Sequence, residues 1–113
     1  MICIDLFLVP TSPPLNVSGL LDDNENLIVT WQPLPLEHRL GIILGYRIMY
    51  EAQNSGNPQE MNVSTFNLSA VLQNVQRGRL YEIKVAAFNN IGEGPPSPLI
   101  VLRSPDGGKR NLI

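Results

Sequence analysis

The chain has 113 residues, which is enough for one domain with its own hydrophobic core and too few for two domains of ordinary size. Hydrophobic residues make up 43% and charged residues 16%, a balance typical of a folded globular domain and not of a disordered segment. The formal net charge is −2 and no basic run is longer than Lys109-Arg110, so composition argues against binding to nucleic acid or to a strongly anionic surface.

Ten prolines and nine glycines are spread along the chain. They predict frequent turns, which suit many short strands better than a few long helices. The only cysteine is Cys3, so no disulfide can form within the chain and packing alone must hold the fold. Because a catalytic thiol needs a partner base, we do not expect Cys3 to be a nucleophile. Composition therefore favours an all-β domain without a disulfide.

The two ends of the chain differ from its middle. Residues 1–9 are apolar except for Asp5 but lack the basic start of a signal peptide, so we expect a tail or the linker from a preceding domain. Residues 106–113 are polar and rich in glycine, and we expect a flexible linker there. No run approaches the roughly 20 apolar residues that span a bilayer, so any membrane anchor is expected outside this fragment. The predicted domain is 10–105.

Apolar and polar residues alternate with the period of a β-strand in seven segments that lie between turn clusters, and no segment predicts a helix. The segments are 15–20, 27–31, 45–52, 60–64, 67–73, 81–87 and 99–103. On the second and fifth segments, the residues predicted to face the core are Leu27, Val29, Trp31, Leu68, Ala70 and Leu72. Seven strands with a buried tryptophan on the second indicate a seven-stranded immunoglobulin-like β-sandwich.

Three motifs follow one another in an order that resembles the fibronectin type III domains. Trp31 is followed by Pro33, and Gly-Ile-Ile-Leu-Gly-Tyr-Arg-Ile-Met-Tyr occupies 41–50. Further on, Tyr-Glu-Ile-Lys-Val-Ala-Ala-Phe-Asn-Asn-Ile-Gly-Glu-Gly-Pro-Pro-Ser occupies 81–97. The resemblance covers roughly 10–105 and implies a fibronectin type III sandwich.

The resemblance implies that six residues determine the fold, which are Trp31, Tyr46, Tyr81, Asn89, Gly92 and Gly94. Trp31 is expected to fill the space between the sheets, and Tyr81 to form the tyrosine corner, with its hydroxyl bonded to the backbone of the preceding crossover. Gly92 and Gly94 are expected to adopt positive φ in the loop between the last two strands. The chain departs from the family's pattern at Arg77 and Arg79, where a proline and a threonine are usual, and at Leu40, where an asparagine is usual.

The sequence offers no convergent set of residues for catalysis. His38 is the only histidine and Cys3 the only cysteine, which leaves no nucleophile with both a base and an orienting group. The glycines of 92–94 lead into prolines and not into a helix, so they do not form a phosphate-binding loop. The acidic segment 22–26 is interpreted as a polar turn and not as a calcium site. We therefore expect no enzyme activity, no cofactor and no metal.

Three tripeptides match the pattern for N-glycosylation, and they begin at Asn16, Asn62 and Asn67. Strand alternation places Val17 and Leu68 inside, so all three asparagines are expected to face solvent and to accept a glycan without disturbing the core. These tripeptides are the main indication in the sequence of an extracellular setting.

One outward face of the predicted sandwich carries apolar side chains that could contact a partner. It belongs to the sheet that holds the third, sixth and seventh predicted strands. Its expected members are Arg47, Met49, Lys84, Phe88 and Val101, together with Ala86 and Leu99. No Arg-Gly-Asp tripeptide lies in 90–96, so an integrin-binding loop is not expected.

The leading hypothesis is a non-enzymatic interaction and spacer module of a multidomain cell-surface adhesion molecule or receptor, similar to the ectodomains of receptor-type phosphatases. Its expected partners are other cell-surface or matrix proteins and neighbouring domains of the same chain, and not nucleic acid. Two alternatives stay open: a structural repeat of an intracellular filament-associated protein, and a spacer domain of a secreted enzyme.

Overall fold

The computed structural model describes residues 8–22, 24–39 and 41–105. It contains seven strands, which are β1 (Leu15–Leu21), β2 (Leu27–Gln32), β3 (Gly45–Ala52), β4 (Gln59–Ser64), β5 (Ser69–Val71), β6 (Leu80–Phe88) and β7 (Ile100–Arg103). A single turn of 3-10 helix, η2 (Leu36–His38), lies between β2 and β3. The predicted linker 106–113 and most of the predicted tail lie outside the described residues.

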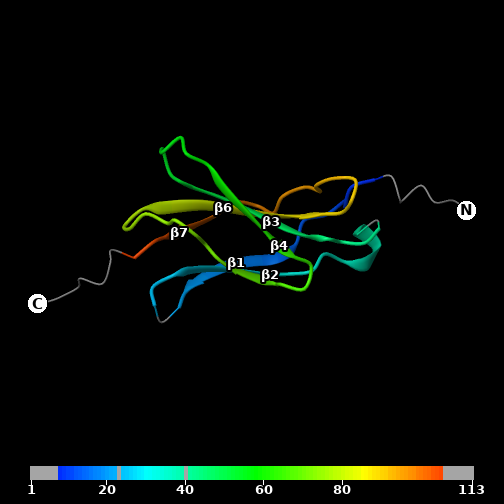
Figure 1. Cartoon of the computed structure of the whole chain (residues 1–113), viewed down its shortest axis with the longest axis horizontal. Helices are drawn as coiled ribbons and strands as arrows, with labels where there is room; N and C mark the ends of the chain where they lie inside the picture. The colour runs from blue at the N-terminus through cyan, green and yellow to red at the C-terminus, as the bar shows by residue number, and fades with distance from the viewer. Residues whose placement is uncertain (1–7, 23, 40, 106–113) are drawn as a thin grey trace, which may run out of the picture.

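The strands form two antiparallel sheets that pack face to face (Figure 1). One sheet has the order β1-β2-β5 and the other the order β4-β3-β6-β7. The described chain enters at one end of the sandwich and leaves at the opposite end (Figure 1). The predicted all-β, immunoglobulin-like sandwich is confirmed, as is the absence of an internal disulfide.

Alternation along each strand sends one set of side chains between the sheets, as the sequence predicted. Leu27, Val29 and Trp31 of β2 face Tyr46, Ile48 and Tyr50 of β3, and all are almost fully buried. The Trp31 and Tyr46 rings meet at 5.3 Å between centroids and join the two sheets near the middle of the core. No helix among the described residues is long and apolar enough to cross a bilayer.

The predicted fifth strand, 67–73, was two residues too long at each end, although Leu72 is buried as expected. β5 starts at Ser69, and Leu68 is 40% exposed instead of facing the core. The preceding residues form a turn in which the Asn67 N–H donates to the Ser64 carbonyl, at 3.0 Å. Leu68 therefore lies at the rim of the sandwich, where the opposite sheet no longer covers it.

Tyr81 is buried at the start of β6, and its hydroxyl accepts a hydrogen bond from the Gln76 N–H at 2.7 Å. The crossover from β5 to β6 therefore closes back onto the core, as in a tyrosine corner. Arg79, which departs from the family's pattern, donates to the Gln53 carbonyl at 2.9 Å and to Gln76 Oε1 at 2.9 Å. The first of these bonds ties the crossover to the residue that follows β3.

Residues just before β1 are held by the loop between β6 and β7 and by the segment between β2 and β3. Asn89 Nδ2 donates to the Leu8 carbonyl at 2.8 Å, and the Thr11 N–H donates to the His38 carbonyl at 2.9 Å. The Asn89 side chain also shapes its own loop, because Asn89 Oδ1 accepts hydrogen bonds from the backbone N–H groups at 91 and 92.

The prediction of positive φ at Gly92 and Gly94 was wrong, since neither glycine is among the positive-φ residues. Close packing, and not positive φ, explains why glycine is needed at position 94. A Cβ on Gly94 would lie 2.6 Å from the Pro10 carbonyl oxygen, and one on Gly92 would lie 3.2 Å from Val9 Cγ1. Gly94 thus leaves room for the segment that leads into β1.

Candidate functional site

The outer face of the four-stranded sheet brings together side chains that are far apart in the sequence. Met49 of β3 lies between Glu60 of β4 and Lys84 of β6, with which it pairs in the strand register. Glu82 pairs with Val101 of β7 on the same face. We call Arg47, Met49, Lys84, Phe88 and Val101, the residues predicted from the sequence, the contact face.

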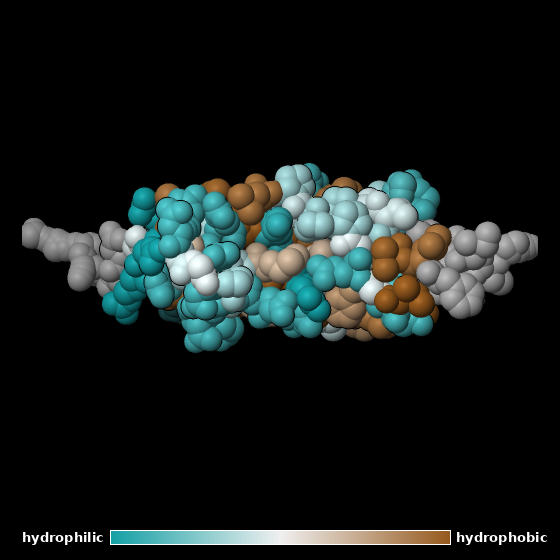
Figure 2. Space-filling view, turned by 90° about the horizontal axis from the view of Figure 1, so that it is seen from above, coloured by the Kyte–Doolittle hydropathy of each residue, from teal (hydrophilic) through white to brown (hydrophobic). Residues whose placement is uncertain are grey.

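A shallow hollow of about 380 Å³ opens beside Met49 and Lys84 of this face. Met49, Lys84 and Leu99 line it together with three carboxylates, those of Glu51, Glu60 and Glu82. The hollow is therefore lined by apolar side chains together with mainly acidic charged groups. Seen from the side of the four-stranded sheet, hydrophilic side chains cover most of the surface and hydrophobic ones emerge between them in small patches (Figure 2).

The three carboxylates were not singled out from the sequence, although the signal was present. Glu51 and Glu82 alternate with buried residues and are directly paired in the register, so period-2 reasoning could have placed them beside Met49. Which strand carried Glu60 next to them depended on strand order, which one sequence does not give.

Arg47 is partly withdrawn from the contact face by two ion pairs. Its Nη1 lies 3.3 Å from Glu60 Oε1 and 3.4 Å from Glu93 Oε1. Because the side chain of Arg47 is 38% exposed, solvent screens these pairs, and their main effect is to position the guanidinium. Glu93 also pairs with Phe88 through an isolated β-bridge, so Arg47 connects the β6–β7 loop to β3 and β4.

The prediction that Ala86 faces outward to a partner was wrong, because Ala86 is fully buried. The register places it opposite Arg47. The chain after β6 also turns back along that strand, with the Gly94 and Ser97 N–H groups donating to the Ala87 and Val85 carbonyls. This returning segment and Arg47 together leave Ala86 no exposed surface.

Phe88 contributes less to the contact face than the sequence suggested. It is half-buried, and a Cβ added to Gly45 would meet its ring at 2.9 Å, so the ring lies over the glycine of the neighbouring strand. Leu99 and Val101, by contrast, are each nearly half exposed. The accessible apolar surface on this side of the sheet therefore consists mainly of Val101 and the neighbouring Leu99, while Met49, like Phe88, is only partly exposed.

The three asparagines of the glycosylation tripeptides are all exposed. Asn62 lies on β4 and pairs with Arg47, while Asn67 lies in the turn before β5. Asn16 lies at an irregularity in β1 with a φ of 53°, and its Nδ2 donates to Gln32 Oε1 at 2.7 Å. Positive φ is a conformation that asparagine adopts more readily than most residues.

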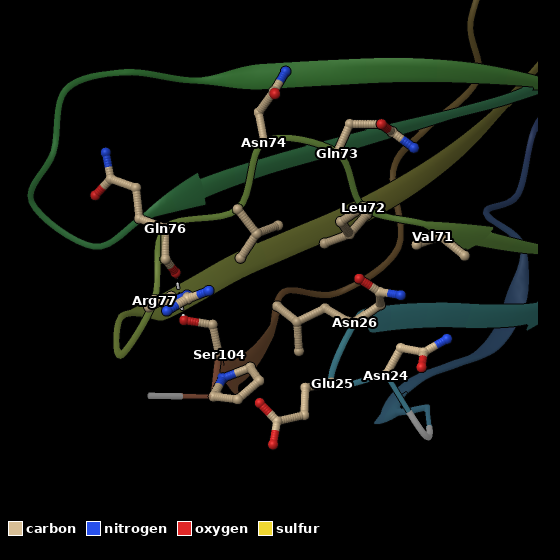
Figure 3. A pocket seen from close by; sticks show the side chains of 13 residues that line it. Asn24, Glu25, Asn26, Val71, Leu72, Gln73, Asn74, Gln76, Arg77 and Ser104 are labelled. Carbon is tan, nitrogen blue, oxygen red and sulfur yellow. Dashed lines mark hydrogen bonds between the residues drawn. The ribbon is translucent and has the colours of Figure 1, made fainter. Parts of the chain in front are cut away.

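A second hollow, of about 530 Å³, lies at the end of the sandwich where the described chain leaves (Figure 3). The turn before β2, the segment after β5, and Ser104 line it, and its charged lining residues are Glu25 and Arg77. Ser104 Oγ donates to the Gln76 carbonyl at 2.6 Å, so this hydroxyl is engaged in holding the exit segment. Amide side chains make up much of the remaining wall (Figure 3).

The acidic turn before β2 is held by its own hydrogen bonds. Asp22 Oδ1 accepts from the Asn24 and Asn26 N–H groups at 2.8 and 2.9 Å. These bonds, chiefly that from the Asn26 backbone, lower the pKa of the Asp22 carboxyl. Asp23 lies outside the described residues, and within the part that is described no group of three or more His, Cys, Asp or Glu is placed to hold a metal ion.

The comparisons with known proteins agree with this architecture. A sequence model of the Fibronectin type III domain matches residues 12–103. The chain is 37% identical to Protein sidekick-1 of Gallus gallus over 101 residues, which cover 87% of this chain and 5% of that protein. It is 29% identical to Receptor-type tyrosine-protein phosphatase F of Homo sapiens over 100 residues, again 87% of this chain and 5% of the relative.

A solved structure of chicken CNTN1 FN1-FN3 domains aligns with a TM-score of 0.75 and 30% identity, and the alignment covers 86% of this chain and 33% of that one. The chain thus spans only a small fraction of the relatives it matches. The extracellular, cell-surface setting expected from the sequence is confirmed by this set of relatives. With the matched sequence, the two-sheet topology and the tyrosine corner in agreement, the chain belongs to the fibronectin type III domain family.

Proposed function

We propose that the chain is a non-enzymatic interaction and spacer module of a multidomain cell-surface adhesion molecule or receptor. The two relatives named by sequence support this role, because the matched domain covers only 5% of each and one of them is a receptor-type phosphatase by name. A catalytic domain elsewhere in such a protein does not make this module an enzyme. The filament-repeat and secreted-enzyme alternatives have no comparable support among these relatives.

The path of the chain through the sandwich supports the spacer role. Entry and exit lie at opposite ends, so the domain adds its length to whatever precedes and follows it (Figure 1). The residues before β1 are bonded to the β6–β7 loop and to the β2–β3 segment, which fixes the direction of entry. A module with these features transmits orientation between neighbouring domains.

The single observation that carries the interaction role is the hollow at Met49 on the contact face. Exposed apolar side chains within a frame of charged groups resemble the composition of a small protein interface, with an apolar centre and a polar rim. Since three carboxylates and one ammonium surround the hollow, the partner surface it fits is an apolar residue flanked by basic side chains.

The test compares binding of the chain with that of two variants. The secreted chain, presented as a multivalent probe, is screened against a panel of cell-surface ectodomains. The Met49→Glu/Val101→Glu variant adds charge to the apolar part of the contact face, and Val71→Glu adds charge at an exposed site on the other sheet. We expect the double variant to lose at least ten-fold in affinity and the control to bind like the parent.

Two results would contradict the interaction role: no ectodomain binds the parent, or binding survives in the double variant while circular dichroism confirms that it is folded.

Glycosylation of the three tripeptides is tested by a separate measurement. Secretion from mammalian cells followed by glycosidase treatment should lower the mass of the chain, and single Asn16→Gln, Asn62→Gln and Asn67→Gln variants assign the loss to positions. A secreted chain without any glycan removes the support that these tripeptides give to the extracellular setting.

A further inference from the structure

The outer face of the three-stranded sheet carries no charge. The sequences of β1, β2 and β5 contain no Asp, Glu, Lys or Arg. The other sheet is different, since its strands carry Arg47, Glu51, Glu60, Glu82, Lys84 and Arg103. The distribution of charge between the two outer faces is therefore strongly unequal.

Side chains on the uncharged face form three rows across the strands. Asn16 and Gln32 make the first, joined by their side-chain hydrogen bond at 2.7 Å. The second is a row of hydroxyl groups and the third a row of aliphatic side chains. Ser18, Thr30 and Ser69 form the second, and Leu20, Ile28 and Val71 form the third. We call these eight residues the neutral face.

The aliphatic row is exposed where a soluble domain would normally carry charge. Leu20 is 50% exposed and Val71 is 39% exposed, and both belong to strands at the edges of their sheet. An exposed apolar row next to sheet edges favours unwanted association unless something covers it.

Asn16 supplies a covering group from within the face itself, because it begins the tripeptide Asn16-Val17-Ser18. Its side chain is exposed and lies in the first row, while Val17 packs against the core. Attachment of a glycan replaces one of the two Nδ2 hydrogens, so the remaining N–H can still donate to Gln32 Oε1. The bond that orients Asn16 is thus compatible with the modification.

We propose that an N-glycan on Asn16 lies along the neutral face and covers its aliphatic row. The inference rests on the proposed extracellular function, because the glycan is added only in the secretory pathway. In the attachment step a lipid-linked oligosaccharide diphosphate is the donor. Its C1–O bond to phosphate breaks, C1 bonds to Asn16 Nδ2, one Nδ2 proton is lost, and the lipid diphosphate leaves.

The chemistry of the face suits a neutral sugar. Hydroxyl and amide side chains in the first two rows can exchange hydrogen bonds with sugar hydroxyls without burying a charge. The aliphatic row begins about 13 Å along β1 from Asn16, at roughly 3.3 Å per residue, which is within the reach of a branched glycan. The C–H faces of its sugars can then pack on Leu20 and Val71.

The other two glycosylation positions act as internal controls. Asn62 lies on the charged sheet opposite Arg47, and Asn67 lies in the turn before β5. A glycan at either position starts on a different part of the surface. Removal of those glycans is therefore expected to leave the aliphatic row covered.

The experiment measures binding of a fluorescent apolar dye to the chain secreted from mammalian cells. Two variants remove the Asn16 glycan: Asn16→Gln changes the acceptor, and Ser18→Ala keeps Asn16 but breaks the tripeptide. We expect both to raise dye fluorescence at least three-fold over the parent, and Asn62→Gln and Asn67→Gln to leave it unchanged. Adding Leu20→Ser and Val71→Ser to Ser18→Ala should return the signal to the parent level. Near-ultraviolet circular dichroism verifies that each variant is folded.

The results separate this inference from the function on which it rests. If Asn62 or Asn67 carries a glycan and Asn16 does not, the extracellular setting stands and the inference is wrong. If no position is glycosylated, the inference is wrong, and the extracellular setting loses the support of the tripeptides and rests on the relatives alone. The inference is also overturned if Asn16 is occupied and its loss changes dye binding no more than the loss at Asn62, or if the glycosylated chain pairs with a second copy through the neutral face.

Discussion

At the residue scale, the hydroxyl of Tyr81 links the core to the crossover before β6. It accepts the Gln76 N–H at 2.7 Å, and removing it leaves a partly buried backbone donor without its partner. We expect Tyr81→Phe to lower the free energy of unfolding by about 1–3 kcal/mol, which urea denaturation monitored by Trp31 fluorescence can measure.

Tyr46→Phe is the matched control for this variant. Tyr46 is equally buried, but its hydroxyl makes no hydrogen bond with any residue that the structure describes. Its loss should change the free energy of unfolding by much less than the loss at Tyr81. Equal effects of the two variants would mean that the corner bond contributes nothing specific.

The same control variant tests a prediction about alkaline pH. Burial raises the pKa of Tyr46 and Tyr50 above the ordinary value of 10.0. Since the unfolded chain then loses these protons at a lower pH than the folded one, the contribution of these two groups to stability should be fully present below about pH 10 and fall as pH rises beyond it. Urea titrations between pH 8 and pH 11 should show a shallower fall in Tyr46→Phe, and an identical fall would rule out a contribution from Tyr46.

At the element scale, the segment before β1 is expected to depend on the small size of Gly94. A Cβ at this position would lie 2.6 Å from the Pro10 carbonyl oxygen, so Gly94→Ala must displace either the segment or the β6–β7 loop. We expect faster hydrogen exchange at the Thr11 amide, which follows Pro10 directly and donates to the His38 carbonyl of the β2–β3 segment. Gly56→Ala strains a remote turn, because Gly56 has a φ of 67°, but its Cβ meets no atom of the entry segment, so it should leave Thr11 exchange unaltered. Unchanged exchange in Gly94→Ala would show that the loop does not hold the entry segment.

The positions of the strands could be predicted from the sequence, because the alternation of apolar and polar residues lies within each strand. Period-2 alternation located all seven strands to within a few residues, because each strand buries one side and exposes the other. The prediction for Ala86 was wrong because a returning segment and Arg47 cover its outward side, and the sequence of β6 alone does not show these contacts. The prediction of positive φ at Gly92 and Gly94 was wrong for a similar reason. The requirement for glycine at 94 comes from a segment about eighty residues away in the chain. Contacts between distant segments are what a single sequence leaves undetermined.

The candidate site was likewise predictable in part. Met49, Lys84 and Val101 were placed on one face by alternation and by the strand order of the resembling family. The acidic frame around them, and the uncharged character of the opposite face, became visible only when the strands were assembled into sheets. The charge pattern of a sheet surface depends on which residues are neighbours across strands, and a single sequence does not give these neighbours.

At the scale of the whole molecule, the two sheets are joined by side-chain packing and not by a disulfide. Cys3 is the only cysteine, and Trp31 of one sheet meets Tyr46 of the other at 5.3 Å between ring centroids. Such a sandwich must depend heavily on its largest inter-sheet side chain, because a domain of this size is stabilised by only about 5–15 kcal/mol in total.

Trp31→Ala is therefore expected to lower the free energy of unfolding by about 3–5 kcal/mol, which is a large part of the total. Trp31→Phe should have a much smaller effect, for two reasons. It keeps an aromatic ring against Tyr46, and the indole N–H that it removes is buried without a hydrogen-bond partner among the described residues. Urea denaturation monitored by far-ultraviolet circular dichroism compares the three proteins, with a reducing agent added in parallel to verify that it has no effect. Similar losses in both variants would mean that the indole itself, and not the filling of the space between the sheets, holds the two layers together.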